Sequence, residues 1–295
     1  MVSQTKIGLF GGECRPDKLH IISRLLEQLN ELGFAVYIHS EFHAFLSGAL
    51  ERIPLIEGIL TGEKFAIDVA LSVGGDGAFL RTAALINKQR IPVLGINTGR
   101  LGFLADVGEN QIAVALKELA EGNYRIEERM LLELKTEDKI FRGFNHALNE
   151  IAILKRDTSS MITIHTYLND EYLTSYLADG LLIATPTGST AYSMSVNGPI
   201  LLPLSDNIIL SPVAPHSLNV RPLVIPGSHS IRLKVESRTQ SFLTALDGRS
   251  EEMPNGTELI VNKSNYTINA VKRNDQSFYR TLREKLMWGV DGRVK

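Results

Sequence analysis

The first third of the chain alternates between short apolar runs and segments with helical periodicity. Within 16–32, for example, apolar residues recur at positions 19, 22, 25, 26 and 29, the spacing of one helix face. The runs predicted as buried strands are 6–10, 34–39, 66–73 and 91–96, and the segments predicted as helices are 16–32, 78–89 and 111–122. This strand–helix–strand order predicts an α/β domain with a mostly parallel sheet.

After residue 124 the pattern changes to short alternating runs that are separated by turn residues. The predicted strands are 130–136, 147–155, 162–169, 172–176, 181–184, 230–236, 241–246, 258–261 and 266–272. Asn169-Asp170 is expected at the tip of a hairpin. Many short strands with intervening turns predict an all-β, sandwich-like domain.

The end of the chain returns to helical spacing over 278–288. The pattern would let this helix dock on either domain, and we expect it to pack back on the N-terminal one. We therefore divide the chain into an α/β domain at 1–124, a β-rich domain at 125–273 and a C-terminal helical segment at 274–295.

The size and composition of the chain narrow the classes of protein to which it can belong. Its 295 residues, 44% of them hydrophobic, suffice for two domains and argue against bulk disorder. A formal net charge of −2 provides no basic field that would attract nucleic acid or an anionic membrane, so neither partner is expected. Cys14 is the only cysteine, which excludes an intrachain disulfide and a multi-cysteine metal site.

Several common sequence signals are absent. The first residues lack the apolar run of a signal peptide, and the longest uncharged stretch, 181–204, is too polar for a membrane span. We therefore expect a cytoplasmic location. The sequence contains no G-x-x-x-x-G-K-[ST] phosphate loop, no H-E-x-x-H zinc motif and no G-x-G-x-x-G dinucleotide fingerprint after an early strand.

The first segment that carries chemistry is a glycine-rich turn. An apolar strand runs into Gly74, Gly75, Asp76 and Gly77, and a helix is predicted to begin immediately afterwards. Glycines let the backbone approach a ligand closely, and a helix N-terminus adds partial positive charge, so the turn suits a phosphate. An aspartate in a phosphate cradle is electrostatically unusual unless a metal ion or a proton-transfer role offsets it. The structural alternative is a turn in which Asp76 caps the helix.

The second segment is rich in hydroxyl groups and follows the apolar run 181–184. Seven of the eleven residues from Thr185 to Ser195 carry a hydroxyl. Hydroxyls both donate and accept hydrogen bonds, which suits the edges of a base or a sugar, and Tyr192 adds an aromatic face. A Ser/Thr-rich loop that caps a helix is the structural alternative. The density and position of the hydroxyls favour ligand binding without naming the ligand.

Two further sites lie in the β-rich part of the chain. Asn149 and Glu150 interrupt an apolar run, and because unpaired burial would cost about 1–3 kcal/mol for each, they must be paired or face a site. Asp247-Gly248 follows a predicted strand and by itself indicates a hairpin turn.

Together these segments resemble the NAD kinase family of the bacterial type, which phosphorylates the 2′-hydroxyl of the adenosine ribose of NAD. The matching blocks follow the family's order at 74–77, 95–106, 149–150, 179–180, 185–195, 197–200 and 215–224. Lipid kinases and phosphofructokinases share a similar Gly-Gly-Asp-Gly turn, whereas the Thr-Pro-Thr-Gly-Ser-Thr-Ala-Tyr segment is far more specific. The resemblance implies an N-terminal α/β domain and a C-terminal β-rich domain.

The resemblance also implies roles for individual residues. Asp76 would contact the reacting ribose and accept its proton within the Gly74, Gly75 and Gly77 cradle, and Arg81 is the candidate for a phosphate contact. The residues that would bind NAD are Asn149, Glu150, Asp179, Thr190, Ala191, Tyr192, Ser193, Met194 and Ser195, with Asp247 nearby. Ala78 stands where the family commonly has Thr, which leaves the nucleotide cradle one hydroxyl short, and Arg249 stands where relatives often have Gln.

The activity that the resemblance implies is transfer of the terminal phosphate of ATP to NAD, giving NADP and ADP. Mg²⁺ or another divalent cation would neutralise the donor phosphates, and no protein metal site is expected. Because phosphoryl transfer has a loose transition state, Asp76 should chiefly orient the hydroxyl and take its proton late. The resemblance also implies a homo-oligomer, a dimer or tetramer. Two alternatives remain open, namely a related kinase for a lipid or sugar and a non-catalytic NAD(P)-binding sensor.

Overall fold

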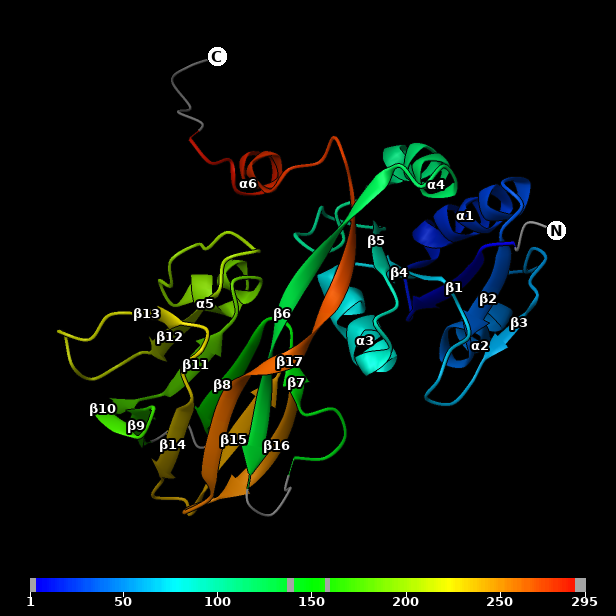
Figure 1. Ribbon diagram of the computed structural model, residues 1–295. Coiled ribbons are helices and arrows are strands. Elements are labelled where there is room, and N and C mark those ends of the chain that lie inside the picture. The colour runs from blue at the N-terminus through cyan, green and yellow to red at the C-terminus, as the bar shows by residue number, and fades with distance from the viewer. Residues whose placement is uncertain (1–3, 137–140, 157–159, 290–295) are drawn as a thin grey trace. The chain divides into compact units, whose positions relative to one another are not determined.

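The chain forms two compact units in the computed structural model, which describes residues 4–136, 141–156 and 160–289 (Figure 1). Unit 1 comprises residues 1–128 and 268–295, and unit 2 comprises residues 129–267. Two long strands, β6 (Tyr124–Thr136) and β17 (Glu258–Arg273), each contain a boundary between the units. The predicted domain bounds, 1–124, 125–273 and 274–295, stay a prediction.

Unit 1 has the predicted α/β architecture, with a mostly parallel sheet. Its strands are β1 (Lys6–Gly11), β2 (Ala35–His39), β3 (Gly58–Leu60), β4 (Val69–Gly74) and β5 (Val93–Asn97), joined at the β5 edge by β17. The order is β17-β5-β4-β1-β2-β3, and every neighbouring pair is parallel. The helices are α1 (Leu19–Glu31), α2 (Ser40–Ala49), α3 (Asp76–Ile86), α4 (Ile112–Ala120) and α6 (Phe278–Leu286).

The hydrophobic core of unit 1 joins the sheet to its helices. The apolar face of α1 supplies Leu25, Leu26 and Leu29, which are fully buried together with Leu9 and Leu71 of the sheet. The C-terminal helix α6 belongs to this unit, as expected, where the ring of its Phe278 lies 6.0 Å from that of Phe103. The helix α2 was missed by the periodicity, because Phe42 and Leu46 are its only buried residues.

Unit 2 consists of antiparallel strands, which confirms the predicted all-β fold class. One sheet has the order β13-β12-β11-β8-β15-β16, and β10-β9-β14-β17 form the other, with β6 paired to β17 and β7. The strands are β7 (His146–Ala147), β8 (Glu150–Lys155), β9 (Ile162–Leu168), β10 (Glu171–Ala178), β11 (Gly180–Ala184), β12 (Asn207–Val213), β13 (Leu223–Pro226), β14 (Ile231–Glu236), β15 (Ser241–Leu246) and β16 (Arg249–Pro254).

The two sheets of unit 2 share one core, which is the packing of a β-sandwich. Ile153 and Ile183 come from one sheet and Ile164, Leu233 and Leu259 from the other, and all five are fully buried in the same cluster. The hairpin tip at Asn169-Asp170 is confirmed, since both residues have positive φ between β9 and β10.

The structure differs from the predicted strands of unit 2 in three ways. Strands β12, β13 and β16 had not been predicted: the apolar parts of β12 and β13 are only three residues long before Ser211 or Pro226, and β16 consists mostly of polar and charged residues. The predicted strands 258–261 and 266–272 form the single strand β17. The predicted strand 147–155 breaks after β7, because the next three backbone N–H groups turn to the side chain of Asp247.

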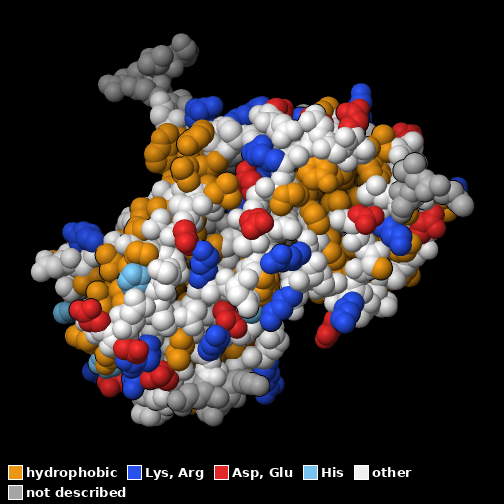
Figure 2. Space-filling model, viewed as in Figure 1, with side chains coloured by type: hydrophobic (Ala, Val, Ile, Leu, Met, Phe, Trp, Pro, Cys, Tyr) orange, Lys and Arg blue, Asp and Glu red, His pale blue; other side chains and the backbone are white. Residues whose placement is uncertain are grey.

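Acidic and basic side chains are mixed on the surface that faces the viewer in Figure 2, without a large region of one sign. This mixture agrees with the near-neutral charge balance of the chain. Among the described residues, no helix has the length and apolar character needed to cross a membrane.

Candidate active site

The glycine-rich turn of unit 1 connects β4 to the first turn of α3. Gly74 has φ +144°, and a Cβ on it would lie 2.7 Å from the Cβ of Ala78, so this position requires glycine. Gly75 is the N-cap residue of α3, and its carbonyl accepts hydrogen bonds from the backbone N–H groups of Ala78 and Phe79. The N–H groups of Asp76 and Gly77, the first two residues of the helix, precede these hydrogen bonds and have no intrahelical partner, which suits them to an anion.

The side chain of Asp76 is held by a loop that follows β5. Its carboxylate accepts hydrogen bonds from three successive backbone N–H groups, those of Phe103 (2.9 Å), Leu104 (2.9 Å) and Ala105 (3.0 Å). Asp76 therefore does not act as a simple helix cap. The stretch 95–106, to which the sequence assigned no role, is the clamp that orients this carboxylate.

Close packing and a buried ion pair shape this clamp. A Cβ on Gly102 would lie 1.9 Å from Oδ1 of Asp76, so only glycine fits there. The Nζ of Lys272 lies 2.6 Å from Oδ2 of Asp106, with both side chains almost wholly buried, and it also donates to the carbonyl of Leu104 (3.3 Å). Leu104, one of the three residues whose backbone N–H bonds to Asp76, is therefore also held at its carbonyl by Lys272.

A cavity of about 400 Å³ lies beside the glycine turn in unit 1. Its lining includes the turn itself, the loop after β1 and three basic side chains, Arg15, Lys18 and Arg81. Arg81 stands next to this loop, since a Cβ on Gly12 would lie 3.2 Å from its Nη2. Backbone N–H groups, a helix N-terminus and basic side chains around one cavity suit a polyphosphate.

In unit 2, Asp247 repeats the arrangement seen at Asp76. It lies in the two-residue turn between β15 and β16, with positive φ at Asp247 and Gly248, so the predicted hairpin turn is confirmed. Its carboxylate accepts hydrogen bonds from the backbone N–H groups of Leu148 (2.7 Å), Asn149 (2.8 Å) and Glu150 (3.2 Å). Arg249 donates to the carbonyls of Phe144 and His146, so it fixes the segment that leads into this clamp.

Glu150 is a largely buried carboxylate next to Asp247. Burial, with a smaller contribution from the negative charge of Asp247, raises the pKa of Glu150 to about 8, against a lowering by a hydrogen bond from the backbone of Tyr192. Among the described residues, Oε2 of Glu150 has no hydrogen-bond partner. A buried carboxyl oxygen without a partner is suited to a ligand hydroxyl, which can accept the carboxyl proton or donate its own.

The hydroxyl-rich segment divides into an internal set and an outward set. The internal set is almost wholly buried and consists of Thr185, Thr187, Ser189 and Ser193. Its hydroxyls bond within the unit, for example Ser193 Oγ to Ser211 Oγ (3.1 Å). The side chain of Ser193 is therefore engaged inside the unit, and its predicted contact with NAD stays a prediction. The outward set, Thr190, Tyr192 and Ser195, can meet a ligand.

The segment packs directly on the Asp247 clamp. A Cβ on Gly188 would lie 2.0 Å from the carbonyl oxygen of Asn149, and the backbone N–H of Thr185 donates to the same carbonyl (2.9 Å). Asn149, Glu150, Asp247 and the helix α5 (Tyr192–Ser195) are thereby brought together in unit 2. Ala191 and Met194 are half-buried in the same segment.

Asp179 lies apart from this group. It precedes β11, where Gly180 pairs with Leu154 of β8, whereas Glu150 pairs with Ala184 at the other end of the same strand. Four residues of strand separate the two ends by roughly 13 Å. The Asp179 carboxylate lies 2.6 Å from the Nζ of Lys155.

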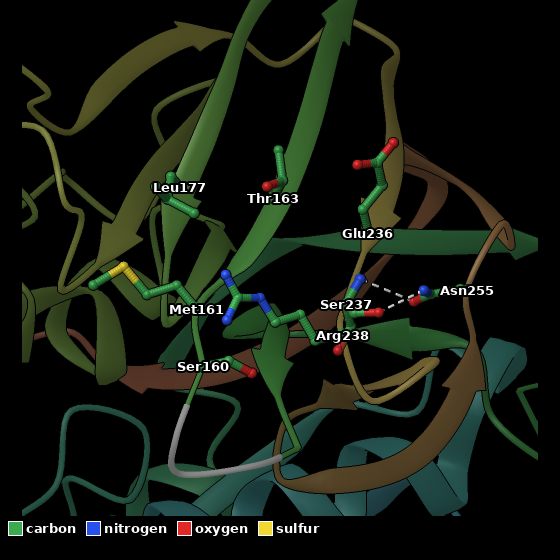
Figure 3. Close-up of a pocket in the computed structure, with 8 residues that line it drawn as sticks. All are labelled: Ser160, Met161, Thr163, Leu177, Glu236, Ser237, Arg238 and Asn255. Atoms are coloured by element: carbon green, nitrogen blue, oxygen red, sulfur yellow. Dashed lines mark hydrogen bonds between the residues drawn. The ribbon is translucent and has the colours of Figure 1, made fainter.

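A cavity of larger volume, about 680 Å³, lies elsewhere in unit 2. It is lined at the ends of β9, β10 and β14 and by the turn at Asn255 (Figure 3). There, the backbone N–H of Ser237 donates a hydrogen bond to Oδ1 of Asn255 (3.0 Å), and Nδ2 of Asn255 donates to the carbonyl of Ser237 (2.7 Å). None of the residues predicted from the sequence lines it, so volume alone does not mark the site.

The described residues contain no group of three or more His, Cys, Asp or Glu side chains that could hold a metal ion together. The oxygens of Asp76 are occupied by the backbone N–H groups of 103–105. This donor set does not form a metal site by itself, but it is compatible with a cation that arrives on the phosphates of a nucleotide.

Sequence reasoning missed three contributors to unit 1. The backbone of 103–105 was overlooked because its side chains are mostly apolar, although the stretch had been noted as a motif. Arg15 and Lys18, which line the cavity, lie at the start of the segment predicted as the helix 16–32, and nothing local distinguishes them from other basic residues. Lys285, whose Nζ lies 3.4 Å from Oδ2 of Asp76, is one of several charged residues of the C-terminal helix, and nothing local distinguishes it.

Comparison with known proteins gives matches over nearly the whole chain. The model of the ATP-NAD kinase N-terminal domain matches residues 13–124, and that of the ATP-NAD kinase C-terminal domain matches residues 148–273. An NAD kinase of Bacteroides fragilis is 47% identical over 289 residues, which cover 98% of this chain and 100% of the relative. An NAD kinase of Porphyromonas gingivalis is 46% identical, with 97% and 98% covered.

Two solved structures share the fold. Yeast NADH kinase, in complex with NADH, aligns with a TM-score of 0.87 at 25% identity and covers 99% of this chain and 90% of its own. An NAD kinase from Archaeoglobus fulgidus, in complex with ATP, aligns with a TM-score of 0.76 at 25% identity, with 96% and 99% covered. These matches give no support to a lipid or sugar kinase or to a non-catalytic sensor.

Proposed function

This chain belongs to the ATP-NAD kinase family, and we propose that it transfers the terminal phosphate of ATP to the 2′-hydroxyl of the adenosine ribose of NAD. The curated relatives, which match this chain over nearly their full length, are named NAD kinase, and the similar solved structures contain NADH or ATP. The products are NADP and ADP.

The observation that carries the proposal is the oriented carboxylate of Asp76 at the turn that borders the basic cavity of unit 1. In the reaction, the bond between the terminal phosphorus and its bridging oxygen breaks and ADP leaves with that electron pair. A bond forms between the ribose oxygen and phosphorus, and the hydroxyl proton passes to Asp76 and then to water. Because the transition state is loose, Asp76 contributes mainly by fixing the hydroxyl in line with the phosphate and accepts its proton late.

The donor phosphates are assigned to the backbone of Gly74, Gly75 and Gly77 and to Arg81. Arg15 and Lys18 line the same cavity and add positive charge. When bound on the nucleotide, Mg²⁺ or another divalent cation would neutralise part of the phosphate charge. Ala78 is buried at this turn and offers no hydroxyl to the nucleotide.

The NAD-binding role is assigned to the group around Asn149 and Glu150 in unit 2. The members assigned to this group are Asn149, Glu150, Thr190, Ala191, Tyr192, Ser193, Met194, Ser195 and Asp247. Asp247 acts by shaping the backbone, since its oxygens are bonded to the N–H groups of 148–150. Asp179 lies at the other end of β8 and β11, so it is not assigned to this group. The homo-oligomer stays an expectation from the family resemblance. Cytoplasmic location stays a prediction from the sequence.

A coupled assay tests the proposed function. The full chain is incubated with NAD, ATP and MgCl₂, and NADP is measured with an NADP-specific dehydrogenase. We expect NADP to form in proportion to enzyme and time, and to be absent when ATP is omitted. Binding of NAD without NADP formation would overturn the kinase assignment, and MgCl₂ replaced by EDTA tests the need for the cation.

A further inference from the structure

The carboxylate of Asp76 has one contact that does not come from the clamp loop. A carboxylate offers about four acceptor positions. Oδ1 accepts from Leu104 and Ala105, and Oδ2 accepts from Phe103. The remaining position faces the Nζ of Lys285 at 3.4 Å, the longest of the four contacts.

Lys285 is brought to Asp76 by the packing of α6. Its Nζ lies 4.4 Å from the centre of the Phe103 ring, and Phe278 of the same helix packs on that ring from 6.0 Å. Phe103 is also the residue whose backbone N–H bonds to Oδ2 of Asp76. Phe103 therefore contacts the helix α6 through its ring and the carboxylate of Asp76 through its backbone N–H.

The positive charge of Lys285 lies where two negative groups of the reaction would otherwise repel each other. A polyphosphate donor and Asp76 are both negative, so their approach is unfavourable unless a cation lies nearby. Lys285 supplies such a cation, and its side chain is only 29% exposed, where water screens the charge less than at an open surface. Both family models end before α6 begins at Phe278, so neither covers this helix.

We propose that Lys285 is a positioning residue of the phosphoryl-transfer site and that the C-terminal helix is thereby part of that site. The ammonium holds Oδ2 of Asp76 in place and offsets its charge while the donor binds. Because its contact is the longest of the four, it is the one that the substrate hydroxyl replaces. The inference rests on the proposed function, since it acts through Asp76.

The test compares two variants of α6 that each remove one positive charge. Lys285→Met keeps an apolar stem on Phe103 but loses the ammonium. Arg283→Met makes the same change in net charge two residues away, on a different face of the helix. We expect Lys285→Met to lower kcat about tenfold, the scale of one hydrogen bond to a charged group, with little change in KM for NAD. Arg283→Met should leave kcat within about twofold of the wild type.

Rescue and folding controls make the outcome decisive. Lys285→Arg should recover most of kcat, because it restores the charge, and the thermal midpoints of the three variants should agree. Equal kcat values for Lys285→Met and Arg283→Met would overturn the inference, as would failure of Lys285→Arg to recover kcat. If Lys285→Met does not fold, Lys285→Gln is measured in its place against the same control. A wild-type chain that forms no NADP would instead reject the proposed function itself.

Discussion

Asp247 and Glu150 are joined by two hydrogen bonds, one accepted by the Asp247 carboxylate and one by the Glu150 backbone carbonyl, while the negative charges of their carboxylates repel each other. The N–H of Glu150 donates to Oδ1 of Asp247 (3.2 Å), and the N–H of Asp247 donates to the carbonyl of Glu150 (3.1 Å). Burial and the charge of Asp247 raise the pKa of Glu150 to about 8, above its ordinary value of 4.5. The turn at Asp247 therefore fixes the backbone of 148–150 and also favours the protonated form of the Glu150 carboxyl.

This raised pKa predicts a pH dependence of stability. The folded state binds the Glu150 proton more tightly than the unfolded state, so this stabilisation is complete below the unfolded pKa of 4.5 and is lost as pH rises to about 8. We expect Glu150→Gln, which has no proton to lose, to make the fall in unfolding free energy shallower over that range. Urea unfolding from about pH 5 to pH 9 measures it. The exposed control Glu171→Gln should keep the wild-type slope, and an unchanged slope in Glu150→Gln would contradict the prediction.

Replacement of Asp247 by Asn should destabilise unit 2. The asparagine keeps one acceptor oxygen for three N–H groups and turns an NH₂ group towards them, so at least one buried donor loses its partner. We expect the free energy of unfolding to fall by about 2 kcal/mol. Asp170→Asn, at a hairpin tip where the side chain is 87% exposed, should change it by less than about 0.5 kcal/mol. If the two substitutions changed the free energy of unfolding equally, the hydrogen bonds to Asp247 would contribute no more to stability than an exposed turn residue does.

Gly102→Ala tests whether the position of the Asp76 carboxylate matters for the reaction. The added methyl group would lie 1.9 Å from Oδ1 and must displace the carboxylate or the loop. We expect kcat to fall about 100-fold, the loss typical of a misplaced catalytic group. Gly108→Ala, with open space around its Cβ, is the matched control and should retain activity. Normal turnover in Gly102→Ala would mean that the clamp geometry is not needed for catalysis.

Asp76→Asn separates binding from chemistry. The amide cannot take the hydroxyl proton, so kcat should fall at least about 100-fold, within the range for loss of a general base. NAD binding, measured by calorimetry, should persist because the residues assigned to NAD lie in unit 2. Near-normal turnover together with NAD binding would remove the proposed role of Asp76.

Local patterns were sufficient for several parts of the fold. The leucines of α1, the apolar strands β4 and β5 and the tip at Asn169-Asp170 all follow from periodicity or turn chemistry within a few residues. The long strand β17 was predicted as two pieces, because its polar interruption at 262–265 resembles a turn when neighbouring strands are ignored.

The sequence by itself determined the types of secondary structure, the glycine turn at Asp76 and the resemblance that named a reaction. Only the tertiary structure decided which groups those residues meet. Asp76 finds its partners 27 to 29 positions away in the loop 103–105 and 209 positions away at Lys285. Four hydroxyls of the segment 185–195 turn inward for the same reason, because the direction of a side chain depends on packing against distant strands, whereas a local motif records only the composition of the segment.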